Sequence, residues 1–289
     1  MNTCQRVFSL CALTLLTQAA FAQSAPQLGA AKDFAVLSAA ANGGGAVTCT
    51  DSIINGNVGS SGAPASIVQT SCNISGATIA PVPAQVVSDF DQAYVTLGLQ
   101  QCTQTISQAA FTGESLTVQP GVICFPAAAT FTDTTITLQG GSNDLWIFKV
   151  GSSGVGALTG TGLQVVMAGG QACNVYWWVD AATTLTTTGF QGTILSGAAV
   201  TATGLGTPST AYNGNMLAKA AVTLTNFSLT GCEGGISNPA PSKKKCNQGV
   251  GNGPEACDPG NSNQGNPLRS NDEEGGVPGN PGRKGGNNK

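Results

Sequence analysis

The sequence predicts a mostly β fold, an irregular β-solenoid with one long α-helix packed alongside it. Charged residues make up only 9% of the chain, against roughly 25% in typical globular domains, and Val, Thr, Ala and Gly are abundant. Between residues 130 and 231, short apolar and Thr-rich runs alternate with Gly and Asn corners, as in coils that stack on one another. A single stretch near residue 90 has the apolar spacing of a helix.

The N-terminus is expected to be a secretory signal peptide, residues 1–22. It has Arg6, an apolar run over 7–16, and Ala20-Phe21-Ala22 as a cleavage site. The run is too short to span a bilayer, and no later segment has the length of a membrane helix. We therefore expect a secreted, extracellular and monomeric protein without a membrane span.

The predicted solenoid domain covers residues 23–237. Residues 238–289 contain Gly, Asn, Pro and charged residues with very few apolar ones, so this stretch cannot build a core. We expect a flexible tail that serves as a linker or solubilising extension, with attachment to the cell surface as the alternative role.

Two of the ten cysteines lie in the signal, which leaves an even number in a secreted chain and predicts disulfides. Pairing between sequence neighbours is the simplest of the many connectivities. The candidates, in that order, are Cys49 with Cys72, Cys102 with Cys124, Cys173 with Cys232, and Cys246 with Cys257.

Short strands separated by turn residues are expected between residues 34 and 78. After Pro81 and Pro83, the helix is predicted over about 84–104. An apolar stripe should pack it against the β body, and its aromatic residues should belong to the core. The stripe consists of Val86, Val87, Phe90, Tyr94, Leu97 and Leu99.

A repeated pattern dominates the second half of the chain: an apolar residue followed by Thr-x-Thr. Because successive strand residues point to opposite faces, each occurrence predicts two threonines on the outer face. The ten threonines are Thr132 and Thr134, Thr159 and Thr161, Thr186 and Thr188, Thr201 and Thr203, and Thr223 and Thr225. The steps between occurrences are uneven, so either the solenoid is irregular or one pattern lies on another face.

A flat threonine wall is a candidate site for binding ice. Same-face residues lie about 6.6–6.8 Å apart along a strand, and neighbouring strands lie about 4.7–4.9 Å apart, which gives a grid of hydroxyl and methyl groups. The β-branched side chains are stiff, so the grid is ordered before binding. The alternative is that threonine is present only because it favours strands.

Other functions find less support. The chain has no histidine, which excludes Ser-His-Asp and His-metal sites, and we expect neither a metal nor another cofactor. Three basic residues in the body are too few for nucleic acid. The sparse carboxylates favour a non-enzymatic protein over a polysaccharide-acting enzyme. A surface adhesin or structural solenoid that binds a sugar polymer or another cell is the alternative function.

Residues from about 28 to 231 resemble the microbial ice-binding (antifreeze) protein family. Each matching segment is short, but their order along the chain is specific. The segments are LGAAKDFAVL from residue 28, INGNVG from 54, LWIF from 145, QACNVYW from 171, FQGTIL from 190, YNGNMLA from 212 and AVTL from 221. The resemblance implies a discontinuous β-solenoid of roughly triangular section with a long helix beside it. It also implies adsorption to ice through one flat face, without a cofactor.

Overall fold

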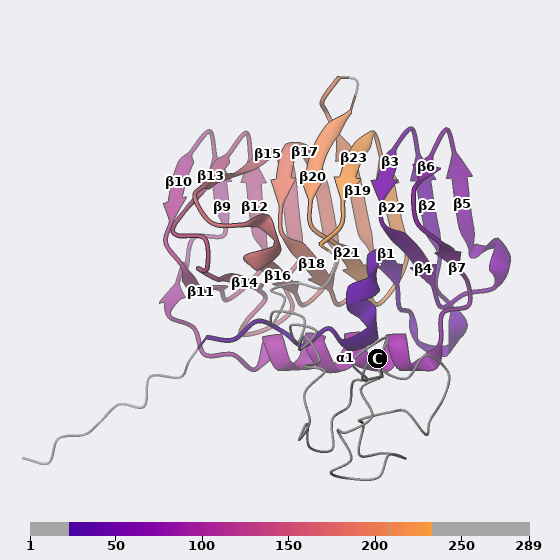
Figure 1. Cartoon of the computed structure of the whole chain (residues 1–289). Coiled ribbons are helices and arrows are strands. Elements are labelled where there is room, and N and C mark those ends of the chain that lie inside the picture. The colour runs from indigo at the N-terminus through magenta and orange to yellow at the C-terminus, as the bar shows by residue number, and fades with distance from the viewer. Residues whose placement is uncertain (1–22, 208, 233–289) are drawn as a thin grey trace, which may run out of the picture. The chain divides into compact units, whose positions relative to one another are not determined.

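A computed structural model describes residues 23–207 and 209–232. The predicted signal peptide, the predicted tail and the Cys246–Cys257 pair lie outside these residues. The described part is a β-solenoid of parallel strands in which each coil runs through three faces, called A, B and C, with one α-helix along face A (Figure 1). The predicted fold class is confirmed.

Face A is a sheet of nine parallel strands in the order β7-β4-β1-β21-β18-β16-β14-β11-β8. Its strands are β1 (Phe34–Ser38), β4 (Asn57–Ser60), β7 (Thr78–Ile79), β8 (Gln104–Thr105), β11 (Gly121–Phe125), β14 (Trp146–Val150), β16 (Val175–Val179), β18 (Thr193–Ser196) and β21 (Met216–Ala218).

Face B follows face A in every coil, and its strands are also parallel. They are, in stacking order, β5 (Ile67–Thr70), β2 (Val47–Thr50), β22 (Val222–Thr225), β19 (Val200–Gly204), the first halves of β17 (Thr183–Gln191) and β15 (Leu158–Ala168), β12 (Ala129–Thr132) and β9 (Ala110–Thr112).

Face C completes each coil. One part consists of β10 (Ser115–Val118), β13 (Thr135–Gln139) and the second half of β15. The other consists of the second half of β17 with β20 (Thr210–Asn213), β23 (Phe227–Thr230), β3 (Ile53–Asn55) and β6 (Asn73–Ile74).

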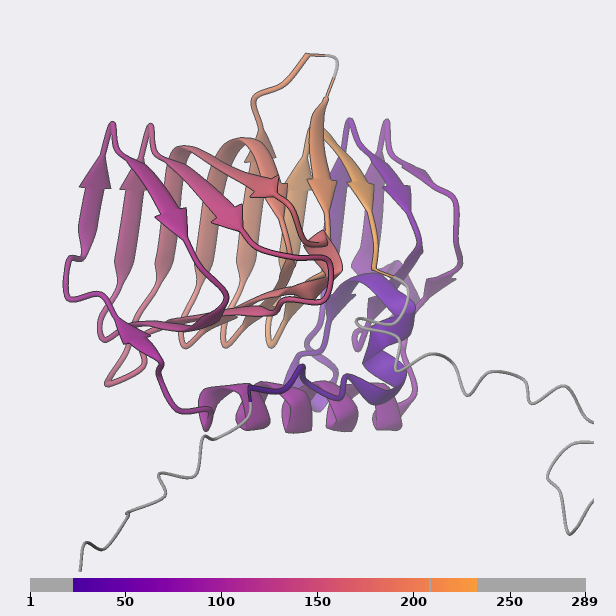
Figure 2. The same cartoon turned by 60° about the vertical axis from the view of Figure 1, so that its left-hand side comes forward.

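The solenoid is discontinuous because the chain starts in the middle of the stack. The strands β1 to β7 build one end, α1 returns along face A, and β8 to β23 build the stack from the other end (Figure 2). The last coil then pairs with the first: β21 with β1, β22 with β2 and β23 with β3. Paired residues in these neighbouring strands are therefore, by subtraction, 175 to 180 positions apart in the sequence.

The interior between the three faces is filled by apolar side chains that alternate with outward polar ones. Aromatic rings stack from coil to coil, as in Phe148 on Trp177 with centroids 3.9 Å apart and Phe190 on Tyr212 at 5.5 Å. Three disulfides tie the coils together: Cys49–Cys72, Cys102–Cys124 and Cys173–Cys232. The predicted neighbour pairing is confirmed for these six cysteines.

Helix α1 (Ala84–Gly98) buries Val86, Phe90, Tyr94 and Leu97 against the outer surface of face A. The hydroxyl of Tyr94 donates to the carbonyl oxygen of Val179 at 3.1 Å, which confirms a packing role for this residue. The helix thereby covers face A and leaves faces B and C exposed (Figure 1).

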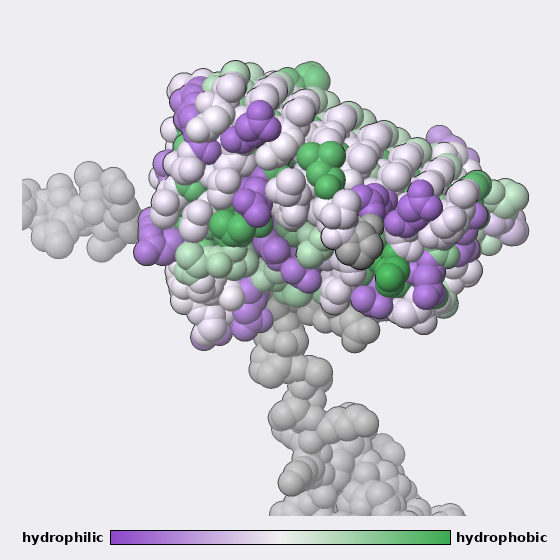
Figure 3. Space-filling model, turned by 90° about the horizontal axis from the view of Figure 1, so that it is seen from above, coloured by the Kyte–Doolittle hydropathy of each residue, from purple (hydrophilic) through white to green (hydrophobic). Residues whose placement is uncertain are grey.

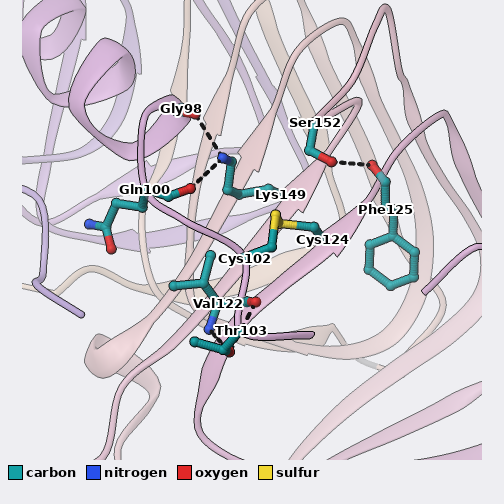
Figure 4. Close-up of a disulfide and its surroundings, with 9 residues drawn as sticks. All are labelled: Gly98, Gln100, Cys102, Thr103, Val122, Cys124, Phe125, Lys149 and Ser152. Atoms are coloured by element: carbon teal, nitrogen blue, oxygen red, sulfur yellow. Dashed lines mark hydrogen bonds between the residues drawn. A yellow bond between two sulfur atoms is a disulfide. The ribbon is translucent and has the colours of Figure 1, made fainter. Parts of the chain in front are cut away.

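The helix ends at Gly98 and not near residue 104 as predicted, and Leu99, predicted on the buried stripe, is 73% exposed. The ammonium group of Lys149 donates to the carbonyl oxygens of Gly98 at 2.7 Å and Gln100 at 2.8 Å and so caps the helix end (Figure 4). The Cys102–Cys124 disulfide then draws the chain onto β11. Tertiary contacts, not helix propensity, set this boundary.

Candidate functional site

Face B presents two columns of threonines that run along the whole stack. Parallel pairing places them in register from strand to strand. The first column is Ala110, Thr130, Thr159, Thr184, Thr201, Thr223, Thr48 and Val68. The second column is Thr112, Thr132, Thr161, Thr186, Thr203, Thr225, Thr50 and Thr70.

All of these side chains point outward. Strand residues alternate between the two faces of a sheet, and the residues before and between the two columns point into the core. Thr130 and Thr132, for example, flank Phe131, which is fully buried and stacks on Phe111. Every threonine of the two columns is exposed or half-buried. The parallel strands place the columns on a grid with about 4.7–4.9 Å between strands and about 6.6 Å between columns.

No charged side chain occupies either column. Asp133 and Asp51 lie at the corner between faces B and C, directly after the second-column residues Thr132 and Thr50. Seen from above, one side of the molecule is a regular array of pale, near-neutral side chains, and strongly hydrophilic side chains gather on the other (Figure 3). Face B can therefore contact an uncharged, ordered partner without removing water from ions.

Groups with shifted pKa values lie away from face B. A hydrogen bond from the backbone N–H of Ala30, and then one from Gln85, lower the pKa of Asp89 on α1. Burial lowers the pKa of Lys149 and raises that of Tyr176 to about 12. The site itself carries no titratable side chain in its two columns.

Eight of the ten predicted threonines lie in the two columns: Thr132, Thr159, Thr161, Thr186, Thr201, Thr203, Thr223 and Thr225. All five patterns therefore share one face. The patterns in β12 and β17 were assigned two residues too late in the chain, starting with a second-column residue. The spacing stays uneven in the correct frame: the first-column threonines Thr130, Thr159, Thr184, Thr201 and Thr223 are, by subtraction, 29, 25, 17 and 22 residues apart, because the coils differ in length.

Thr134 was predicted on the outer face, and this prediction is wrong. Its side chain is fully buried, and its hydroxyl donates to the carbonyl oxygen of Thr132 at 3.0 Å. Asp133 between them has φ 46°, a left-handed conformation that ends the strand and turns the chain into face C. The alternation of strand residues does not continue through such a corner.

Thr188 was also predicted in the ladder, and this too is wrong. It is exposed, but it lies beyond the last paired rung of face B, where β17 crosses from face B to face C. Thr184 takes its place in the first column, paired with Thr159 and Thr201.

Six threonines of the face were missed by the sequence reasoning: Thr48, Thr50, Thr70, Thr112, Thr130 and Thr184. Val47-Thr48-Cys49-Thr50 has the same pattern as the five predicted strands and could have been found by extending the search to the N-terminal half. Thr70 and Thr112 carry no such pattern, because their first-column partners are Val68 and Ala110.

Within residues 23–207 and 209–232, no group of three or more His, Cys, Asp or Glu side chains could hold a metal ion. Among the helices of the same residues, none is long and apolar enough to cross a membrane.

The family follows from a comparison with known proteins. The family model described as Ice-binding-like matches residues 39–230, more than half of the chain, and this range contains both threonine columns. The chain belongs to the Ice-binding-like family.

Relatives of this Ice-binding-like chain are similar in sequence and in fold. An ice-binding protein of Flavobacterium frigoris (strain PS1) is 30% identical over 184 residues, which are 58% of this chain and 64% of the relative. This chain thus spans less than two thirds of that relative's length.

Two crystal structures show the same architecture. One is an ice-binding protein from an Antarctic bacterium of the Flavobacteriaceae: 29% identity, TM-score 0.58, covering 72% of this chain and 47% of that chain. The other is an ice-binding protein from the Antarctic ascomycete Antarctomyces psychrotrophicus: 25% identity, TM-score 0.59, covering 72% of this chain and 98% of that chain.

Proposed function

We propose that this protein adsorbs to ice through face B and thereby inhibits ice growth or recrystallisation. The observation that carries the proposal is the pair of in-register, uncharged threonine columns, which extends over eight strands. Membership of the Ice-binding-like family supports the same partner and favours a binding protein over an enzyme.

The mechanism depends on the rigidity of the face. Threonine has few side-chain conformations on a strand, and the parallel ladder fixes its position, so little conformational entropy is lost on binding. The hydroxyls hydrogen-bond a first layer of water, and the methyl groups restrict the orientations of that water. Many weak contacts act together, and the absence of charge avoids competing orientations of water.

We also propose that the protein acts outside the cell, with no cofactor. The predicted signal peptide and the three disulfides fit an oxidising compartment. In this proposal, the exposed face B binds ice outside the cell.

The test is a pair of matched substitutions. Thr201→Tyr places a large ring in the middle of face B, and Thr230→Tyr makes the same change on the exposed outer side of β23 in face C. We expect the first to reduce incorporation into slowly grown ice and thermal hysteresis to below about a tenth of the wild-type values, because the flat contacts are lost together.

Thr230→Tyr should retain both activities, and both variants should keep the wild-type thermal stability, since exposed substitutions change it little. Equal ice incorporation of the wild type and Thr201→Tyr would exclude face B as the adsorbing surface. Loss of activity only in Thr230→Tyr would assign the function to face C.

A further inference from the structure

Gln23 directly follows Ala20-Phe21-Ala22, the predicted cleavage site of the signal peptide. Cleavage there turns the backbone nitrogen of Gln23 into a free α-amine. An N-terminal glutamine can cyclise, because its α-amine can attack the carbon Cδ of its own side-chain amide and form a five-membered lactam, pyroglutamate. The inference below rests on this predicted cleavage site and not on the proposed adsorption to ice.

The cyclisation needs no second reactant. The bond between Nα and Cδ forms, the bond between Cδ and Nε2 breaks, and a proton moves from Nα to Nε2, which leaves as ammonia. The lactam therefore lacks both the positive charge of the α-amine and the two N–H groups of the glutamine amide. Contacts that hold this amide nitrogen in the folded protein must break before the ammonia leaves.

The side-chain amide nitrogen of Gln23 donates to two backbone carbonyl oxygens, that of Gly121 at 2.9 Å and that of Leu145 at 2.7 Å. These two bonds use its whole donor capacity. Gly121 is the first residue of β11, and Leu145 directly precedes β14. The N–H of Gly121 also donates to the carbonyl oxygen of Leu145 at 3.0 Å, so the pairing of β11 with β14 fixes the distance between the two acceptors.

The residues after Gln23 are held beside α1, on the same side of the solenoid (Figures 1 and 2). Pro26 and Leu28 are buried, and Leu28 belongs to the apolar cluster between α1 and face A. The side-chain amide of Gln100, two residues beyond the end of α1, donates to the carbonyl oxygen of Ser24. Both the side chain of Gln23 and the chain that follows it are thus anchored.

We propose that the fold protects Gln23 from cyclisation by holding its side-chain amide on β11 and β14. Closure of the lactam requires Cδ to approach Nα and Nε2 to leave, and both movements break the bonds to Gly121 and Leu145. Gln23 is therefore a modification site that is open only between cleavage of the signal peptide and folding. The mature folded protein keeps an intact glutamine with a free α-amine.

The experiment measures the loss of ammonia from the N-terminal peptide by mass spectrometry, in protein expressed with its own signal peptide. Folded protein and protein unfolded in guanidinium chloride are incubated at about pH 8.5, where an ordinary α-amine is mostly unprotonated. We expect the folded protein to lose ammonia at least about tenfold more slowly, because two hydrogen bonds must break first.

Gln23→Ala is the control for the chemistry, because alanine has no side-chain amide and cannot form the lactam. Ammonia that this variant loses comes from other sites, such as succinimide formation at Asn55-Gly56 or Asn213-Gly214. Peptide mapping separates these sites from the N-terminal peptide.

A matched pair of variants tests the anchoring of the segment after Gln23. Gln100→Ala removes the bond to Ser24, and we expect it to raise the rate in the folded protein about twofold or more. Gln108→Ala removes another exposed amide, which donates to the carbonyl oxygen of Ala110 in β9 at 2.8 Å, and should leave the rate unchanged.

Equal rates in folded and unfolded wild-type protein would overturn the protection, as would equal folded-state rates in Gln100→Ala and Gln108→Ala. A purified protein that begins at another residue, or that carries the lactam in every molecule, would also overturn it. None of these results bears on the adsorption of face B to ice, which Thr201→Tyr tests separately.

Discussion

At the scale of single residues, the corner between faces B and C is set by left-handed backbone conformations. The residue directly after a second-column threonine has a φ between 46° and 66° in six coils: Asp51, Ser71, Gly113, Asp133, Gly162 and Asn226. Glycine, Asn and Asp adopt this conformation most readily. In these six coils the corner therefore ends face B directly after the second-column threonine.

Lys149 illustrates how one buried side chain fixes a distant element. It is only 4% exposed, no carboxylate within residues 23–207 and 209–232 accepts from it, and its ammonium group donates to the carbonyl oxygens of Gly98 and Gln100 at the end of α1. The cation also complements the negative end of the helix dipole.

We expect Lys149→Met to lower the free energy of unfolding by about 1.5–3 kcal/mol, because two half-buried carbonyl oxygens lose a charged donor. Thermal unfolding measures this loss. Lys219→Met is the matched control: Lys219 is partly exposed, its salt bridge to Asp91 is 3.0 Å long, and such pairs contribute less than about 1 kcal/mol. Equal effects of the two substitutions would contradict the capping role.

At the scale of elements, the terminal coil of β5, β6 and β7 has a neighbouring coil on one side only among the residues that the structure describes. Its residues Val68 and Thr70 are the last members of the two columns of face B. Two of its strands, β6 and β7, have only two residues each. The Cys49–Cys72 disulfide joins this coil to β2, with Cys49 buried between Thr48 and Thr50. Covalent linkage substitutes for the packing that a further coil would provide.

Replacing Cys49 and Cys72 together by alanine should therefore loosen this end of the solenoid first. The bridge closes a sequence separation of 23 residues, and we expect a loss of about 3 kcal/mol in unfolding free energy. Hydrogen exchange should show amides of β5 and β6 losing protection while those of β17 keep it. Uniform protection in the variant would contradict this local role.

At the scale of the whole molecule, the helix that covers the solenoid and the columns proposed to adsorb to ice lie on different faces. Face A is covered by α1, and the side chains with shifted pKa values lie away from the columns of face B. The two exposed faces differ in their outward residues: face B has threonine, whereas face C includes Gln191, Asn213 and Asn55.

Ice-growth inhibition should consequently be independent of pH between about 5 and about 8, the range in which histidine ordinarily titrates, because the chain contains no histidine. Thermal hysteresis in matched buffers measures this. Below this range stability should decrease: the folded-state pKa of Asp89 is lowered from 3.8, so its contribution is complete above 3.8 and is lost as the pH falls through the lower value. A change of activity with pH at constant stability would place a titrating group in the adsorbing face.

The sequence by itself determined the fold class, the buried stripe of α1 except Leu99, and eight threonines of face B. Each of these follows from local periodicity, which a strand or helix imposes on its own residues. Pairing between sequence neighbours also predicted the three disulfides. The cysteines of Cys49–Cys72 and Cys102–Cys124 are 23 and 22 residues apart, about one coil, whereas those of Cys173–Cys232 are 59 residues apart.

Only the tertiary structure decided which threonines complete the face. A short Thr-rich run permits more than one choice of the two threonines that point outward on face B. For Thr130 and Thr184, the choice depends on where a left-handed corner or a bend ends the strand. Thr48 and Thr50 carry the same local pattern as the predicted strands. Their place beside Thr223 and Thr225, however, depends on the stacking of the last coil on the first, a contact between segments far apart in the chain that no local pattern encodes. The end of α1 likewise depends on Lys149, which reaches it from β14 through the packed interface.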